Sequence, residues 1–210
     1  MALARGWAWA RRRGRRGPPD GPAVDWLIVG LGNPGARYDG TRHNVGQAAV
    51  RALADRHRIA LDTIKHQARY GLGRIGAARA CLVLPTTYMN LSGRAVAPIA
   101  RFYQVPPERV VAVVDDMDLP LGRQRLRAGG GHGGHNGLRS LIELLGTPAF
   151  PRLRLGVGRP PAGWDPADYV LARFAPDEAA AAAALVDDAV VTLEDVVARG
   201  VEAAMNRANA

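Results

Sequence analysis

A single α/β domain is predicted for this chain of 210 residues, built as a twisted mixed sheet with a parallel centre and helices on both faces. Two observations predict it. Short apolar runs alternate with segments whose apolar residues recur at helical spacing, which is typical of strands joined by crossover helices. The length also suits one domain with a sizeable core. We therefore place the folded domain at residues 26–210.

Five strands are expected where apolar residues form short runs bounded by glycine, proline or polar clusters. These runs lie at residues 26–31, 70–75, 80–84, 110–114 and 152–158. Four residues join the second run to the third, so this pair is expected to form a hairpin. The run at 110–114 contains only valine and alanine. A strand of that composition is typical of the buried centre of a parallel sheet.

A sixth strand is expected at residues 122–127, where arginine occurs at every second position. Because strand side chains alternate between faces, Arg123, Arg125 and Arg127 should lie on one face. Helices are expected where apolar residues follow the helical period. They lie at residues 45–57, from the end of the loop at 85–93 to about 103, at 138–145, and at 177–205 as one long amphipathic helix.

The chain carries a net charge of +9, almost all of its positive charge from arginine. This balance favours a polyanionic partner such as nucleic acid, although solubility alone would account for it. Residues 1–25 hold +4 of the charge. They lack the apolar stretch of a secretory signal and the hydroxyl-rich face of a transit peptide, so a disordered basic tail is expected there.

Membrane partners and disulfides are not expected. No apolar segment is long enough to span a membrane. The one cysteine, Cys81, lies in an apolar run and has no partner for an intramolecular disulfide. It is expected to be a small core residue in a reducing compartment, which favours the cytoplasm.

Residues 30–46, GLGNPGARYDGTRHNVG, are too polar and too rich in turn residues to belong to the core. They follow a buried strand, and ligands of open α/β sheets bind at loops of this kind. Gly30, Gly32 and Gly35 also match a dinucleotide fingerprint, which requires a helix to open at the third glycine. No helical pattern starts there, so no nucleotide cofactor is expected. We place a catalytic base, His43, in this loop.

Polar side chains suited to a site follow the predicted strands. They are Asn33, His43, Asn90, Asp115 and Asn136. No nucleophile elbow is present, and His132 with His135 would be too few ligands for a metal. A histidine can deprotonate water, an aspartate can fix its tautomer, and carboxamides can hold a carbonyl. The set favours direct hydrolysis of an activated ester.

Structural roles remain open for several of these residues. Asp115 would also suit the cap of a turn, and Asn90 and Asn136 each precede a helix that an asparagine would cap well. The loop at 129–137 is harder to explain in this way, because it contains six glycines. Ordering so many glycines costs entropy, and a purely structural loop has little need of them.

Taken together, these motifs resemble one family, the bacterial-type peptidyl-tRNA hydrolases. The matching stretches occur in the family's order and cover about residues 25–207; they are 30–35, 41–44, 85–93, 115–120, 129–137 and 152–158. The resemblance implies a monomeric α/β enzyme, without cofactor or obligate protein partner. It implies cleavage of the ester between a peptide and the 3′-terminal ribose of tRNA. The basic tail departs from the family pattern.

The resemblance also implies roles for individual residues. His43 matches the catalytic base, Asp115 the acid that supports it, and Asn33 the position associated with recognising an N-blocked substrate. Other positions match the substrate cleft, namely Tyr38, Tyr88, Asn90 and Asn136, and contacts to tRNA phosphate, namely Arg127 and Arg154. The alternative is an RNA-binding protein of the same fold without catalysis. The presence of His43, Asp115 and the three asparagines argues against it.

Overall fold

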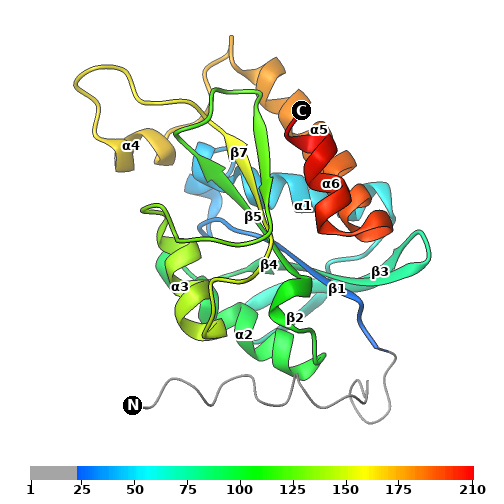
Figure 1. The fold of residues 1–210 in the computed structure, drawn as a ribbon. Helices are drawn as coiled ribbons and strands as arrows, with labels where there is room; N and C mark the ends of the chain where they lie inside the picture. Colours follow the sequence, from blue (N-terminus) through cyan, green and yellow to red (C-terminus); the bar gives the residue numbers. More distant parts are fainter. Residues whose placement is uncertain (1–22) are drawn as a thin grey trace.

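A seven-stranded mixed sheet forms the centre of the computed structural model, which describes residues 23–210 (Figure 1). The strand order is β2-β3-β4-β1-β5-β7-β6. Strands β4, β1, β5 and β7 are parallel, whereas β2, β3 and β6 pair antiparallel with their neighbours. The strands are β1 (Trp26–Gly30), β2 (Thr63–Lys65), β3 (Ala68–Ile75), β4 (Ala78–Pro85), β5 (Val110–Asp116), β6 (Gln124–Arg127) and β7 (Arg152–Gly156).

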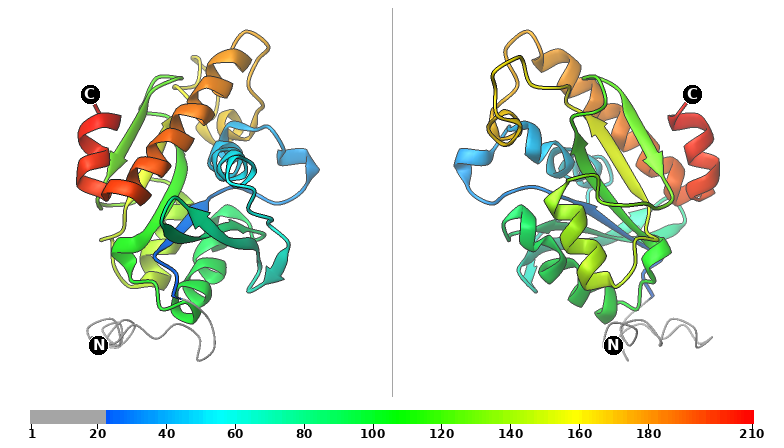
Figure 2. Two further views of the ribbon diagram at one scale, coloured as in Figure 1. Left: turned by 90° about the vertical axis from the view of Figure 1, so that its right-hand side faces the viewer. Right: turned by 60° about the vertical axis from the view of Figure 1, so that its left-hand side comes forward.

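Helices cover both faces of the sheet, as the two turned views make plain (Figure 2). Helices α1, α5 and α6 pack on one face, and α2 and α3 pack together on the other. The predicted fold class is therefore confirmed. The helices are α1 (Val45–Arg56), α2 (Ser92–Phe102), α3 (Asn136–Leu145), α4 (Pro166–Leu171), α5 (Ala179–Arg199) and α6 (Val201–Ala208), with short 3₁₀ turns η2 (Ala36–Tyr38), η3 (Arg42–Asn44), η4 (Met89–Leu91) and η5 (Pro107–Arg109).

The core lies in two apolar layers, one on each side of the sheet. Every residue of β1 and β5 is buried, because both strands are covered on both faces. Cys81 of β4 is fully buried without a disulfide partner, which confirms the predicted core cysteine; burial also raises the pKa of its thiol.

Three elements differ from the prediction. Strand β2 was not predicted, because it is short and wholly exposed and its sequence therefore contains no apolar run. Helix α4 has only six residues; it begins at Pro166 and is capped by the Asp165 carboxylate. The predicted single helix at 177–205 was wrong, because Gly200 has a φ of 85° and separates α5 from α6. A residue with a side chain would be strained in that conformation.

The described chain is already packed ahead of β1. Val24 is buried, and the carboxylate of Asp25 accepts a hydrogen bond from the Arg79 amide. The rest of the predicted tail, residues 1–22, lies outside the described residues. Among the helices of residues 23–210, none is long and apolar enough to cross a membrane.

Glycines in the stretch at 30–46 allow one backbone to approach another. A Cβ on Gly30 would lie 2.5 Å from the Gly46 oxygen, and a Cβ on Gly46 would lie 2.2 Å from the Val113 oxygen. The start of α1 therefore lies directly against β1 and β5. These two glycines therefore serve the packing of α1 against the sheet. After Gly35 the chain forms η2 rather than the helix of a dinucleotide site.

Candidate active site

A pocket of about 700 Å³ opens where β1, β4 and β5 end. These strands are parallel, so their carboxyl ends meet at one edge of the sheet. Seven of the predicted site residues line the pocket, namely Asn33, His43, Tyr88, Asn90, Asp115, Asn136 and Arg154. Tyr38 and Arg127 do not line it. Tyr38 is half-buried in η2 beneath the guanidinium of Arg37.

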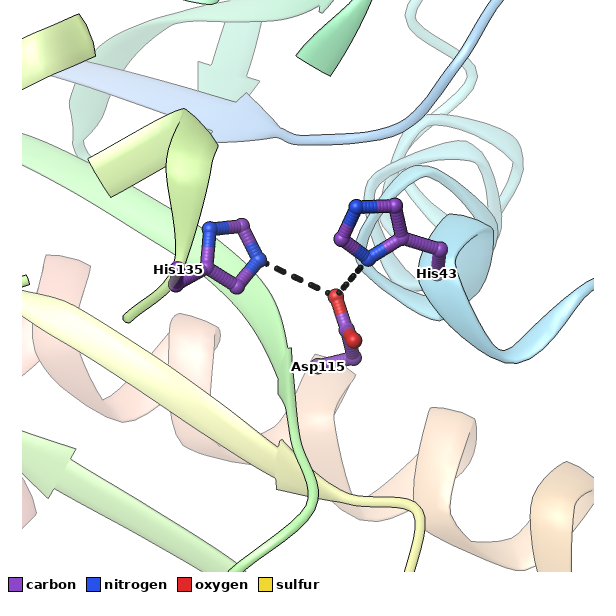
Figure 3. A group of neighbouring side chains, drawn as sticks. All are labelled: His43, Asp115 and His135. Carbon is purple, nitrogen blue, oxygen red and sulfur yellow. Dashed lines mark hydrogen bonds and ion pairs between the residues drawn. The ribbon is translucent and has the colours of Figure 1, made fainter. Parts of the chain in front are cut away.

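One aspartate oxygen is hydrogen-bonded to the rings of two histidines at the centre of the pocket (Figure 3). Asp115 is buried near the end of β5. Its Oδ1 lies 2.8 Å from Nδ1 of His43 on η3 and 3.1 Å from Nε2 of His135, which directly precedes α3. Segments far apart in the sequence thus join at one carboxylate.

Protonation in this group follows from its hydrogen bonds. Burial alone would raise the pKa of Asp115, but the charge of His43 and hydrogen bonds from both histidines hold that pKa well below its usual range. An ionised carboxylate only accepts hydrogen bonds. Both ring nitrogens that face Asp115 therefore carry protons. For neutral His43 the lone pair then sits on Nε2, where it is able to accept a proton from water.

His135 supports this assignment independently. Its Nδ1 accepts hydrogen bonds from the amides of Gly137 and Leu138, at 3.1 and 3.3 Å, and so caps α3. A nitrogen that accepts from two amides has no proton, so the proton of the neutral ring is on Nε2. We predicted no functional role for His135 from the sequence. Its position shortly before a predicted helix was the one signal that pointed to a capping residue.

The three side chains also have the composition of a metal site, since their ligand atoms lie within 4.8 Å of one another. A metal would need the lone pairs of the imidazole nitrogens that face Asp115. In this network both nitrogens donate protons to the carboxylate, and Nδ1 of His135 is engaged by α3. One imidazole lone pair remains, on His43 Nε2. The donor set therefore fits acid–base chemistry better than metal binding.

Asn33 ties three segments of the pocket together. Its Oδ1 accepts from the Met89 amide at 2.8 Å, which connects the loop after β1 to η4. Its backbone is held in both directions by the Asn44 side chain, at 2.8 and 2.9 Å. Among the described residues its side-chain NH₂ has no acceptor, so this group is left for a ligand.

The structural alternatives for the predicted polar residues do not hold. The turn after β5 is capped by Asp116, whose Oδ1 accepts from the Asp118 amide, and not by Asp115. Helix α2 has no side-chain cap, so Asn90 does not fill that role. Helix α3 is capped by His135, with Asn136 as its first residue. Asn90 and Asn136 therefore present their side chains along the pocket instead.

The glycine-rich loop at 129–137 reaches the pocket by an indirect path. Strand β6 runs antiparallel to β7. Its last residue, Arg127, therefore lies beside Arg152 at the start of β7, at the end of the strands that is remote from the pocket. The loop then returns along β7. The buried guanidinium of Arg152 donates to the Gly130 and Gly131 carbonyls, at 2.6 and 2.8 Å. Burial, with the nearby charge of Arg154, lowers the pKa of Arg152 to about 10. The loop follows a strand, as expected, but it starts at the end of β6 that is remote from the pocket.

Four arginines share one face of the β6–β7 ribbon. Arg125 lies directly opposite Arg154, and Arg127 opposite Arg152, while Leu126 and Leu153 face the core. This confirms the predicted face for Arg125 and Arg127, whereas Arg123 precedes β6 and is not part of the strand. Like charges in directly opposed positions destabilise a sheet. Arg154 is offset by Asp116, whose Oδ2 lies 2.8 Å from its Nε, but Arg125 and Arg127 have no carboxylate partner among the described residues. Such a ribbon suits a polyanion.

An α/β fold with a histidine–aspartate pair in a pocket, beside an arginine ribbon, defines a hydrolase of the general-base type with an anionic substrate. The family model described as peptidyl-tRNA hydrolase matches residues 27–210, and the chain belongs to that family.

Individual peptidyl-tRNA hydrolases are similar to this chain in sequence and in structure. The chain is 52% identical over 185 residues to a peptidyl-tRNA hydrolase of Symbiobacterium thermophilum, covering 87% of this chain and 98% of the relative. It is 51% identical over 186 residues to that of a Roseiflexus species, covering 88% and 86%. A crystal structure of the Acinetobacter baumannii peptidyl-tRNA hydrolase superposes with a TM-score of 0.84 at 40% identity, covering 90% of this chain and 98% of the other.

Proposed function

We propose that this enzyme hydrolyses the ester between an N-blocked peptide, or an N-acyl amino acid, and the 3′-terminal ribose of tRNA. It thereby recycles tRNA from prematurely released peptidyl-tRNA. Family membership supports this function, and one observation carries it in the structure. Nδ1 of His43 is fixed on an ionised Asp115, which leaves Nε2 as the base in a pocket beside the arginine ribbon.

The reaction follows from these protonation states. Nε2 of His43 takes a proton from water as the water oxygen bonds to the ester carbonyl carbon. The tetrahedral intermediate then breaks its bond to the ribose oxygen, and the imidazolium returns the proton to that oxygen. Asp115 stabilises the imidazolium, and the bond from His135 keeps the carboxylate in place. No covalent bond between enzyme and substrate is needed.

Substrate contacts are divided between the pocket and the ribbon. Asn33 recognises the blocked amino group of the substrate with its free NH₂. Tyr88, Asn90 and Asn136 hold the peptide and the 3′ end in the cleft, which they line. Arg127 and Arg154 bind tRNA phosphate. The position of Tyr38 outside the pocket offers no support for the cleft role that the resemblance implies.

The enzyme acts as a monomer in the cytoplasm, without an obligate protein partner. The membership of the chain in the peptidyl-tRNA hydrolase family is the ground for this proposal. Gel filtration of the full chain with light scattering is the check, and a stable dimer would contradict it.

The direct test is hydrolysis of N-acyl-aminoacyl-tRNA by the purified full chain, beside His43→Ala. Turnover by wild type and its loss in the variant are expected, with tRNA binding retained by both. If wild type binds tRNA but releases no product, the proposed function is wrong and the non-catalytic RNA-binding alternative holds.

A further inference from the structure

Helix α4 forms the outer wall of the pocket and has few ties to the rest of the fold. Its residues Pro166, Ala167, Val170 and Leu171 line the cavity. Figure 1 shows it set apart from the sheet and from the helices that cover it. Its main packing partner is η3, the turn that carries His43. The position of this wall relative to the catalytic base therefore depends on how η3 and α4 are joined.

Arg42 makes that junction. Its guanidinium donates to the Arg173 carbonyl at 2.7 Å, just beyond α4, and to the Glu178 carboxylate at 2.6 Å, directly before α5. Its backbone amide donates to the carbonyl of Ala172, the residue that ends α4. The guanidinium also lies 4.2 Å from the centre of the Tyr169 ring within α4. Arg42 is only 6% exposed, so these contacts are shielded from water.

Three successive residues of η3 bind three different segments of the chain. Arg42 binds the segment at 172–178, His43 binds Asp115, and Asn44 binds the loop at Asn33. A 3₁₀ helix has three residues per turn, so consecutive side chains point about 120° apart. The η3 turn thus connects these three segments to one another. Releasing one of its three attachments allows the other two side chains to shift together.

We infer that Arg42 is a positioning residue for the reaction, which locks α4 to the turn that carries His43. Arg42 does not line the pocket, and both terminal nitrogens of its guanidinium donate to the protein itself. Displacement of a reacting group by about 1 Å costs roughly 10²-fold in rate. Loss of this lock should therefore lower kcat even in a fully folded enzyme. The inference rests on the proposed function for its kinetic readout.

The kinetic test compares Arg42→Lys and Arg42→Met with a matched control, Arg56→Met. Arg56 also pairs with a glutamate, Glu194, but far from the pocket on α1 and α5. Both Arg42 variants should lower kcat by roughly 10- to 100-fold, equally for peptidyl-tRNA and for a short N-acyl-aminoacyl ester of adenosine. The salt dependence of tRNA binding should not change. Guanidinium ion, at non-denaturing concentration, should partly restore an Arg42→Ala variant, whereas Arg56→Met should match wild type.

A second measurement does not depend on activity. Amide hydrogen exchange in residues 166–172 should be faster in Arg42→Lys and in Glu178→Gln, while exchange in β5 stays at the wild-type rate. Glu178→Gln keeps an acceptor but removes the charge, so it covers the case in which Arg42 variants fold poorly. Unchanged exchange in α4, or a folded Arg42 variant with kcat within twofold of wild type, would overturn the inference. If wild type lacks hydrolase activity but α4 exchange responds, the proposed function fails and the lock stands.

Discussion

The catalytic centre and the arginine ribbon lie side by side but are built on opposite principles. At the centre, Asp115 is buried and receives hydrogen bonds from His43 and His135, so each group has a fixed partner and a fixed proton. On the ribbon, Arg125 and Arg127 are exposed cations without carboxylate partners among the described residues. The centre depends on geometry and protonation, whereas the ribbon depends on net charge. Substitutions in the two regions should therefore change different kinetic constants.

The largest effect is expected at the base. His43→Ala should lower kcat by roughly 10²- to 10⁴-fold, because water is no longer deprotonated as it attacks. Single-turnover hydrolysis measures this directly, and tRNA binding should stay close to wild type. His57→Ala is the matched control, since His57 forms a similar 2.8 Å pair with Glu194 outside the pocket. If the His43→Ala variant keeps most of its activity, His43 is not the general base and the proposed difference between the two regions is wrong.

Asp115→Asn should lower kcat within the same range, roughly 10²- to 10⁴-fold, and keep the fold. The amide still accepts a hydrogen bond, but it no longer stabilises an imidazolium or dictates the tautomer of His43. The pH–rate profile should shift with it, as the protonated ring loses its counter-charge. A variant with the wild-type profile would show that Asp115 does not orient the base.

The same substitution should change the response of stability to acid. Despite the effect of burial, the two histidines hold the pKa of Asp115 below its usual value of about 4. A lowered pKa in the folded state adds stability above the unfolded pKa, and that stability is lost as the pH falls through the folded pKa. The free energy of unfolding should thus fall more steeply in wild type than in Asp115→Asn between about pH 4 and pH 2. Urea denaturation across this range is the measurement, and parallel curves would contradict it.

The sequence predicted the strands of the two regions better than it predicted the long-range contacts within them. The valine-rich run before Asp115 predicted the central strand, and the alternation of arginine predicted the ribbon face. His135 and Arg152 were not predicted to matter, because their contacts depend on β6 running antiparallel and on the loop returning along β7. No local pattern specifies that path. A buried arginine such as Arg42 likewise has the same sequence signature as a solvated one.

Smaller effects, confined to KM, are expected on the ribbon. Arg127→Ala should raise KM for peptidyl-tRNA and reduce the slope of log affinity against log salt by about one unit per lost phosphate contact. Arg154→Ala should do the same, and Asp116→Asn should strengthen binding by freeing Arg154. Hydrolysis of a short ester should not change for Arg127→Ala. Arg74→Ala, an exposed arginine on β3, is the matched control. Equal loss on both substrates would mean that Arg127 supports the catalytic centre.

The smallest effect concerns substrate choice. The catalytic centre must exclude the positively charged α-ammonium group of free aminoacyl-tRNA without a charged residue of its own for that purpose. The enzyme should cleave N-acylated aminoacyl-tRNA and spare free aminoacyl-tRNA. Asp115 is committed to two histidines and Asp116 to Arg154, so no buried carboxylate among the described residues of the pocket is left for an ammonium group. Asp118 is exposed and pairs with Arg159 at the surface. An ammonium that enters would lose hydration without gaining a counter-charge.

Asn33→Asp tests this selectivity with little change of shape. A carboxylate oxygen is able to keep the bond from the Met89 amide, which Oδ1 of Asn33 accepts at 2.8 Å. The second oxygen then replaces the free NH₂ with a negative acceptor, which attracts an ammonium and leaves the carbonyl of a blocked substrate without its donor. The ratio of kcat/KM for acylated over free aminoacyl-tRNA should therefore narrow. Equal rates for both substrates in wild type would refute the discrimination, and an unchanged ratio in the variant would assign it to other residues of the cleft.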